Sequence, residues 1–354
     1  METFKVFLIT VVVFGVLIFV HELGHFIAAR IFGVRINEFA IGMGPKLFSY
    51  RGKKSGTLYS LRLLPIGGYN SMEGEDGEES GVERGEDSFC SKPVWQRMII
   101  IVSGALMNIL LGFIIMTFIV LTTKNYASNV IDVFVKSEGM TEYPTEYGEL
   151  KSGDRIIKIN GDRVHIADEV SYAIYNEGAD PVNVTVIRDG KKMVIENVQF
   201  PTAERGGMVY GVRNFYFEVE PKNFVNTVKQ TFYGSINSMV QIFDSLKGLV
   251  SGKYGFEAVS GPIGVGEALG QAAKISFSTL LTFTVLLAMN LGIFNLLPIP
   301  ALDGGRLVFL IVEAIRRKPL PKDVEATVNG IGMLILLGLV VVVAFKDVFM
   351  IFGR

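Results

Sequence analysis

The stretch from Phe7 to Arg30 reads FLITVVVFGVLIFVHELGHFIAAR, and its apolar run passes without a break into His21-Glu22-Leu23-Gly24-His25. On a helix, residues i and i+4 share a face, so both imidazoles can reach one metal ion while Glu22 stands beside them. The pattern is typical of a zinc site in which the metal acidifies a water and the carboxylate takes its proton, for attack on a peptide carbonyl. Ionisable groups are costly in an apolar helix, which indicates a function for all three.

Two other interpretations of this motif were weighed against the metal site. H-E-x-x-H also occurs by chance. A chance occurrence would place two imidazoles and a carboxylate in an apolar helix with nothing to offset the free-energy cost of burying them. A cleaved signal peptide does not fit, because charged and bulky residues end the apolar run and no A-x-A-like site follows. The third histidine, His165, lies in a polar segment, where we expect a surface position.

The composition indicates a polytopic membrane protein. With 354 residues, 49% of them hydrophobic, and a mean hydropathy of +0.40, the chain is too apolar for an ordinary soluble enzyme. A net charge of −1 and the lack of an arginine-rich stripe argue against nucleic-acid binding. A single cysteine, Cys90, excludes an intramolecular disulfide and a cysteine-rich zinc module.

Four segments have the length and apolarity of membrane spans: Phe4 to about Arg30, Met98 to Thr123, Ile275 to about Pro298, and Val328 to Phe345. Basic residues gather in the loops after the first and third spans, which the positive-inside rule places in the cytoplasm. They are Arg30, Arg35, Lys46, Arg51, Lys53, Lys54 and Arg62 in one loop, and Arg306, Arg316, Arg317, Lys318 and Lys322 in the other. Both termini and the segment between spans two and three are therefore expected outside, with the histidine pair toward the cytoplasmic side.

The first loop contains two β-prone pieces, Ile36 to Ile41 and Thr57 to Leu63, which predict a hairpin. This hairpin could line the active-site cleft and pair with an extended substrate, or it could be a plain connection on the membrane surface. The acidic, glycine-rich run from Glu73 to Asp87 is interpreted as a solvated loop without a site of its own.

Span two carries one amide, Asn108, after the small residues Gly104 and Ala105. Small residues allow close helix approach, so Asn108 either packs between helices or positions a ligand or substrate strand near the metal. The sequence leaves both roles open.

The segment between spans two and three predicts a small mixed domain and an amphipathic helix. Strands are expected at Val130 to Val135, Arg155 to Ile159, Val182 to Val186 and Met193 to Val198, with a short helix from Asp168 to Asn176. Leu150 to Gly161 resembles the G-D-x-I-x-x-I-N-G core of PDZ domains, which bind peptides by strand addition. From Asn223 to Val250 apolar residues recur at helical spacing, which predicts a helix lying on the outer membrane face. Gly261-Pro262-Ile263-Gly264 is expected to break the chain before span three.

A catalytic zinc normally takes three protein ligands, and with no histidine to spare the third should be a carboxylate. The best candidate is Asp303, at the end of Asn295-Leu296-Leu297-Pro298-Ile299-Pro300-Ala301-Leu302-Asp303-Gly304-Gly305. The prolines end the third span and the glycines let the backbone come close. Without a metal, Asp303 would cap a helix from Arg306 to Arg316.

Taken together, H-E-L-G-H, G-x-x-x-N, N-x-x-P-x-P-x-x-D-G and the PDZ-like insertion resemble the site-2 proteases, M50-type intramembrane zinc metalloproteases, and among them the bacterial sigma-E-type regulators. The resemblance implies Zn²⁺ held by His21, His25 and Asp303, with Glu22 as general base. It implies that Asn295 holds substrate or the developing oxyanion, and we assign Asn108 to substrate positioning as well. Substrates would be transmembrane proteins such as anti-sigma factors or signal-peptide remnants, first cut outside by another protease, in the bacterial cytoplasmic membrane.

We therefore predict a membrane all-α core of four transmembrane helices with a cytoplasmic β-hairpin loop and an extracytoplasmic PDZ-like α+β domain. The expected parts are the first span (1–33), the hairpin loop with the acidic linker (34–97), the second span (98–123), the PDZ-like domain (124–203), the amphipathic helix region (204–273), the third span (274–305), a cytoplasmic loop (306–327) and the fourth span (328–354). A metal-binding transporter is the main alternative, although polar groups here cluster at one depth. A catalytically silent PDZ scaffold is the other, which the intact Glu22 argues against.

Overall fold

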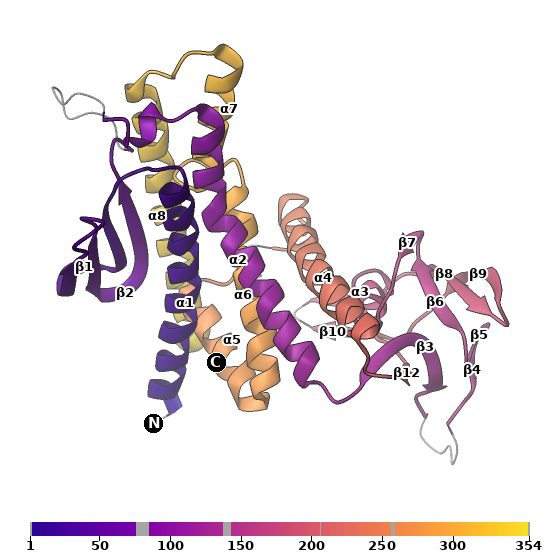
Figure 1. Ribbon diagram of the computed structural model, residues 1–354. Helices are drawn as coiled ribbons and strands as arrows, with labels where there is room; N and C mark the ends of the chain where they lie inside the picture. The colour runs from indigo at the N-terminus through magenta and orange to yellow at the C-terminus, as the bar shows by residue number, and fades with distance from the viewer. Residues whose placement is uncertain (1, 76–84, 137–142, 206, 256–258, 353–354) are drawn as a thin grey trace. The chain divides into compact units, whose positions relative to one another are not determined.

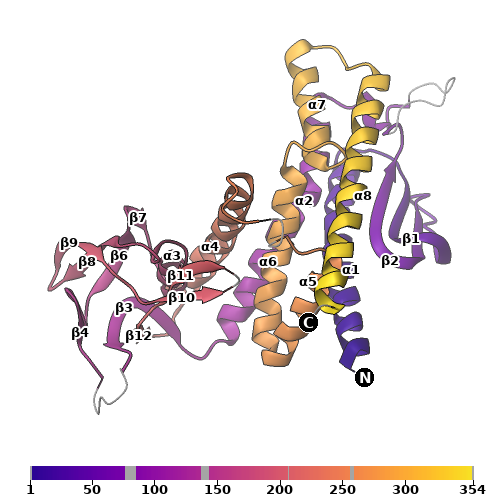
Figure 2. The same cartoon turned by 180° about the vertical axis from the view of Figure 1, so that it is seen from behind.

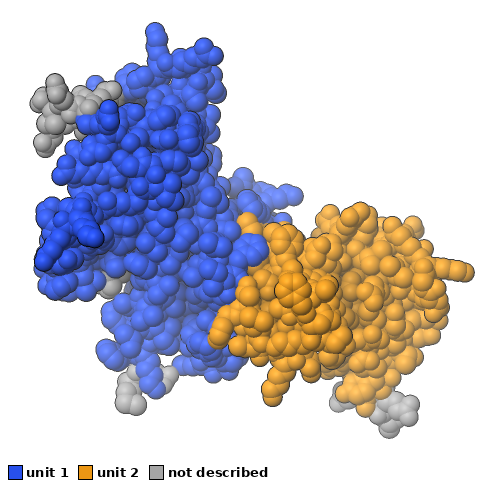
Figure 3. Space-filling view, viewed as in Figure 1, with its two compact units in different colours: residues 1–115, 242–354 blue, residues 116–241 orange. Residues whose placement is uncertain are grey.

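The computed structural model describes residues 2–75, 85–136, 143–205, 207–255 and 259–352. The chain divides into two units, residues 1–115 with 242–354 and residues 116–241 (Figure 3). Two long helices, α2 (Val94–Thr122) and α4 (Phe224–Val250), contribute residues to both units.

Four helices are long and apolar enough to cross a membrane among the described residues: α1 (Glu2–Ile31), α2, α6 (Phe277–Leu296) and α8 (Lys322–Phe352). They coincide with the four predicted spans, which are thereby confirmed as helices. Their long apolar sequences form helices because a helix satisfies every backbone polar group within the segment itself, as a bilayer requires.

Two shorter helices, α5 (Pro262–Ile275) and α7 (Asp303–Arg316), belong to the same unit. The prediction of a mere chain break at Gly261 to Gly264 is wrong, because α5 begins at Pro262. Pro262 occupies the first turn, where its missing N–H costs nothing. The backbone N–H groups of Gly261 and Gly264 donate to the carboxylate of Asp347 on α8, at 3.0 and 2.8 Å, so α8 caps α5.

The predicted hairpin is present and is longer than expected, with β1 at Ile36–Arg51 and β2 at Leu58–Met72 paired antiparallel. It packs against α1, as both ribbon views show (Figures 1 and 2). A short 3₁₀ helix (Phe89–Ser91) precedes α2. The core under the hairpin is formed by Ala28, Ala29, Val34, Ile36, Met72, Phe89, Ile100, Ile101 and Leu310.

The second unit is built on an antiparallel sheet in the order β12-β3-β6-β8-β9, with β7 beside β6. Buried side chains from the sheet and from α3 (Ala167–Glu177) form its core, including Ile131, Phe134, Ile156, Val170, Ile174, Val184 and Phe215. The strands are β3 (Tyr126–Phe134), β4 (Glu146–Tyr147), β5 (Leu150–Lys151), β6 (Arg155–Ile159), β7 (Asp162–Arg163), β8 (Val182–Arg188), β9 (Lys191–Val198), β10 (Thr202–Arg205), β11 (Met208–Gly211) and β12 (Phe215–Glu220). Since β12 completes the sheet, this fold continues beyond residue 203, where the sequence analysis ended the domain.

The G-D turn of the second unit is fixed by a buried charge. Asp154 is fully buried, and its carboxylate accepts hydrogen bonds from the Arg188 guanidinium at 2.6 and 2.7 Å and from the Lys151 N–H at 2.8 Å. His165 is partly exposed, as expected, and its ring stacks on Tyr233 of α4 with centroids 3.8 Å apart. A buried, fully paired aspartate gives this turn a structural role.

Candidate metal centre

Helix α1 presents its two histidines one turn apart on the same face, as the sequence predicts. Their Nε2 atoms are 3.2 Å apart, and the side chains of His21 and His25 are only 12% and 8% exposed. Burial of two imidazole rings removes their hydrogen bonds to water, so a third group is needed to offset that cost.

That third group is Asp303, which arrives from the other end of the chain. Pro298 and Pro300 follow the end of α6, and Ala301 takes a positive φ of 71°, after which α7 begins with Asp303 as its first residue. The Oδ2 atom of Asp303 lies 3.2 Å from His21 Nε2 and 3.4 Å from His25 Nε2. Leu302, not Asp303, holds the N-cap position, so the carboxylate is turned to the histidines and does not cap the helix.

These three side chains form a possible metal site. Ligand atoms about 2.0–2.2 Å from a tetrahedral zinc stand roughly 3.3–3.5 Å apart, close to the three separations found here. Asp303 Oδ2 is buried and makes no hydrogen bond within the described part of the chain, which leaves its lone pairs open to a cation. Two imidazole nitrogens and one carboxylate oxygen are a common donor set of catalytic zinc, so the residues fit this ion.

Helix α2 packs directly behind the two imidazoles. His25 Nδ1 is 2.8 Å from the backbone carbonyl oxygen of Ile100, and a Cβ added at Gly104 would overlap the His25 ring. Asn108, fully buried, has its Nδ2 atom 3.4 Å from His21 Nδ1. The small residues of span two therefore bring a helix, and with it polar groups, against the ligands.

Two ion pairs hold α7, and with it Asp303, in place. Arg97 of α2 donates to both carboxylate oxygens of Glu313, at 3.1 and 2.5 Å. Arg306 pairs with Glu75, which follows β2. Charge-assisted pairs of this kind add directional specificity, so α7 is held near its start by Arg306 and near its end by Glu313.

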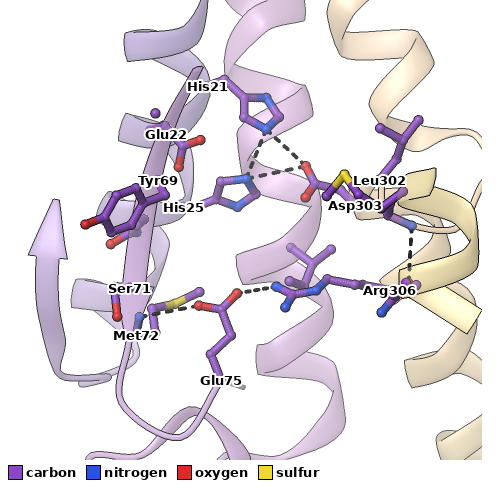
Figure 4. Close-up of a pocket in the computed structure, with 17 residues that line it drawn as sticks. His21, Glu22, His25, Tyr69, Ser71, Met72, Glu75, Leu302, Asp303 and Arg306 are labelled. Atoms are coloured by element: carbon purple, nitrogen blue, oxygen red, sulfur yellow. Dashed lines mark hydrogen bonds and ion pairs between the residues drawn. The ribbon is translucent and has the colours of Figure 1, made fainter. Parts of the chain in front are cut away.

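The site opens into a cavity of about 670 Å³. Figure 4 shows Glu22 on the β2 side of the two imidazoles and Asp303 on the opposite side, on α7. Residues of β2 and of α8 also line the cavity: Gly68, Tyr69, Asn70, Ser71 and Met72 from β2, and Asn329, Gly330 and Met333 from α8. The cavity is therefore bounded by the hairpin on the side where Glu22 stands.

Sequence reasoning missed several residues of this cavity. Glu75 lies in the acidic run expected to have no site, and it lines the cavity, while residues 76–84 of that run lie outside the described residues. Arg306 was predicted only as a cytoplasmic basic residue, and no role was predicted for Tyr69. Neither Asn108 nor Asn295, the two expected substrate-positioning residues, is among the described residues that line the cavity.

The hairpin carries one strongly perturbed carboxylate. Burial raises the pKa of Glu38, but hydrogen bonds from Ser60 at 2.5 Å and Arg62 at 2.9 Å, and one shared with Tyr69, outweigh it and hold the pKa at about 2. Arg62 also donates to the hydroxyl of Tyr69, which lines the cavity. An ionised Glu38 thus braces the strand that faces the metal ligands.

Known proteins are similar to this chain over most of its length. The sequence pattern described as Peptidase family M50 matches residues 9–339. A Clostridium perfringens protein whose name includes the words zinc metalloprotease is 37% identical over 337 residues, 95% of this chain and 96% of its own length. The Regulator of sigma-W protease RasP of Bacillus subtilis is 31% identical over 420 residues, 96% of this chain and 97% of its own length. The similarity therefore extends over both units.

Proposed function

The chain belongs to peptidase family M50 and is a multi-pass zinc metalloprotease, and from this premise we propose that it hydrolyses peptide bonds inside the transmembrane segments of single-pass proteins. The observation that carries the proposal is the close triangle of His21, His25 and Asp303, next to Glu22, with both histidines on a helix long and apolar enough to cross a membrane. A soluble protease has no reason to place its ligands there.

Each residue of the site has a proposed role. His21, His25 and Asp303 would hold Zn²⁺, and the bound ion would supply a Lewis acid for the scissile carbonyl and lower the pKa of a water molecule. Glu22, beside the ligands and not among them, takes the proton of that water on its carboxylate and delivers it to the leaving nitrogen. The side chains of His21 and His25 are only 12% and 8% exposed, and charge interactions are stronger at buried positions than in water.

The hairpin is the proposed guide for substrate. A transmembrane helix exposes no free backbone groups, so a cleavable segment has to unwind before its scissile carbonyl can reach the metal site. Residues 68–72 of β2 line the cavity, and an unwound segment can lie along them in extended form. Asn295, near the end of α6, remains a proposed contact to substrate or oxyanion.

The proposed orientation puts the hairpin and the loop after α6 in the cytoplasm, supported by the basic residues of both, and puts both termini outside. The second unit is then extracytoplasmic, and we assign it as a PDZ-like domain on the G-D turn at Gly153 and Asp154. Because the Bacillus subtilis relative is named a regulator of sigma-W protease, we infer that the substrates include membrane-bound regulators such as anti-sigma factors, or signal-peptide remnants, trimmed first by an outside protease.

Two variants test the proposal in proteoliposomes with a single-pass substrate. Glu22→Gln keeps the shape of the side chain but cannot accept a proton, so it should retain zinc and lose about 100- to 10,000-fold in turnover. Asp303→Ala removes a ligand, so it should lose zinc and turnover together. Metal analysis of the purified proteins beside the cleavage assay separates the two roles. Zinc lost from Glu22→Gln, or full zinc in Asp303→Ala, would refute the assignments.

A further inference from the structure

Three residues of α2, spaced four apart, form one stripe that faces the two metal-ligand histidines. Ile100 meets His25 through its backbone oxygen, Gly104 leaves room for the His25 ring, and Asn108 meets His21. Residues i, i+4 and i+8 lie along one face of a helix, so a single surface of α2 supports both imidazoles. The contact at Gly104 is one of packing, whereas the contacts of Ile100 and Asn108 are between polar atoms.

The contact at His25 shows how such support works. A carbonyl oxygen can only accept, so at 2.8 Å from the Ile100 oxygen the Nδ1 atom of His25 must carry the proton. That leaves the lone pair on Nε2, and Nε2 is the atom that faces Asp303. The backbone of α2 thereby selects the tautomer that can bind a metal.

His21 also needs a hydrogen-bond acceptor at its Nδ1 atom, and Asn108 does not supply one in its present amide orientation. His21 also faces Asp303 through Nε2, so metal binding requires the proton on Nδ1, which is then a donor. Facing it at 3.4 Å is Nδ2 of Asn108, another donor, while Oδ1 of Asn108 is buried and has no partner among the described residues. A half-turn of the amide exchanges two atoms of nearly equal size and brings Oδ1 to His21.

We propose that Asn108 is a positioning residue of the metal site, whose Oδ1 accepts the Nδ1–H of His21 and fixes both the tautomer and the tilt of that ring. This replaces the expectation that Asn108 touches substrate, and it agrees with the position of Asn108 outside the described cavity lining. The inference rests on the zinc site of the proposed function. Loss of such an outer hydrogen bond typically weakens metal binding about 10–100-fold.

The test compares zinc affinity, measured by competition with a fluorescent chelator on the purified full-length protein, among three variants. Asn108→Leu keeps the volume without an acceptor and should bind zinc about 10–100-fold more weakly. Asn108→Asp keeps an acceptor and should bind at least as tightly as the wild type. Asn290→Leu is the matched control, because Asn290 is also an amide in an apolar helix, with a buried Oδ1 that lacks a partner among the described residues, but lines a different cavity. It should leave zinc affinity unchanged.

Two further measurements separate a positioning role from contact with substrate, and the first needs neither turnover nor a variant. In zinc-loaded wild type labelled with ¹⁵N-histidine, His21 Nδ1 should give the signal of a protonated nitrogen, with His165 as reference. In Asn108→Leu saturated with zinc, KM should stay near the wild-type value. An unprotonated His21 Nδ1, or unchanged zinc affinity with a raised KM, would overturn the proposal. A wild type that binds zinc but cleaves nothing would instead refute the proposed function alone.

Discussion

Gly104 stands where α2 passes the imidazole of His25, and even one added methyl group would overlap that ring. We expect Gly104→Ala to push His25 away from Asp303 and to lower zinc affinity at least about tenfold, although alanine favours a helix by about 1 kcal/mol over glycine. Gly338→Ala on α8 is the matched control, because a Cβ there meets open space. Chelator competition on both proteins measures the effect, and equal affinities would show that the close approach of α2 is dispensable.

At the scale of single residues, the sequence predicted the groups whose chemistry is unusual for their surroundings. His21, Glu22, His25 and Asp303 could be found because charges in apolar segments need a reason. The carbonyl of Ile100 could not, since every residue has one and only the packing of α2 on α1 selects it. Glu75 was hidden because its use depends on an ion pair with Arg306, far away in the chain.

At the scale of elements, the hairpin depends on an ionised Glu38, which also has Lys46 at 3.5 Å. Its pKa is lowered from 4.5 to about 2 in the folded chain, so its contribution to stability is present above about pH 4.5 and is lost as the pH falls toward 2. The difference in unfolding temperature between wild type and Glu38→Gln should therefore be largest near pH 6 and shrink by pH 3. A difference that is constant from pH 6 to pH 3 would contradict this account.

Helix α5 depends on a carboxylate supplied by α8. Asp347 is 4% exposed and accepts the N–H groups of Gly261 and Gly264, so Asp347→Ala leaves one buried and one partly buried donor without this partner and should cost about 2–4 kcal/mol. Asp347→Asn retains one acceptor oxygen and should lose less. Thermal unfolding in detergent measures both, and an alanine variant as stable as wild type would mean that water replaces the carboxylate.

The elements that sequence reasoning placed correctly are those with one dominant pattern. Long apolar runs predicted the membrane spans, and the alternation of apolar and polar residues predicted β3, β6, β8 and β9 in the second unit. The hairpin was predicted too short because Gly42, Gly44 and Gly67 lie inside its strands, where glycine normally marks a turn. Helix α5 was missed because glycines at 264, 266 and 270 and a proline at its start hide its helical period.

At the scale of the whole molecule, the chemistry and the second unit are separable, since His21, Glu22, His25 and Asp303 all belong to the first unit. Lys222 donates to the backbone oxygens of Leu121 and Thr123, so the chain enters and leaves the sheet at neighbouring points. Residues 126–220 can therefore be replaced by a short glycine-serine linker. A deletion of only Asn129 to Pro201 would remove most of β3 and leave β12 without the strand it pairs with.

We expect this deletion to leave zinc binding intact and to relax substrate choice. If the second unit excludes proteins that still carry folded outer domains, the shortened enzyme should cleave an untrimmed membrane substrate that the full chain does not cleave. Cleavage of trimmed and untrimmed versions of one substrate, by both enzymes, measures this. A folded, zinc-loaded deletion that cleaves neither version would mean that the domain delivers substrate.

The distance along the chain between the ligands has a consequence for biosynthesis. His21 and His25 leave the ribosome early, whereas Asp303 follows only after the hairpin, the sheet domain and three spans have been made. A nascent chain, or a fragment that stops before α7, offers two donors where catalytic zinc needs three. We expect such products not to cleave other proteins in the membrane. The enzyme would become active only after α7 has been synthesised, much as a zymogen becomes active only after its propeptide is removed.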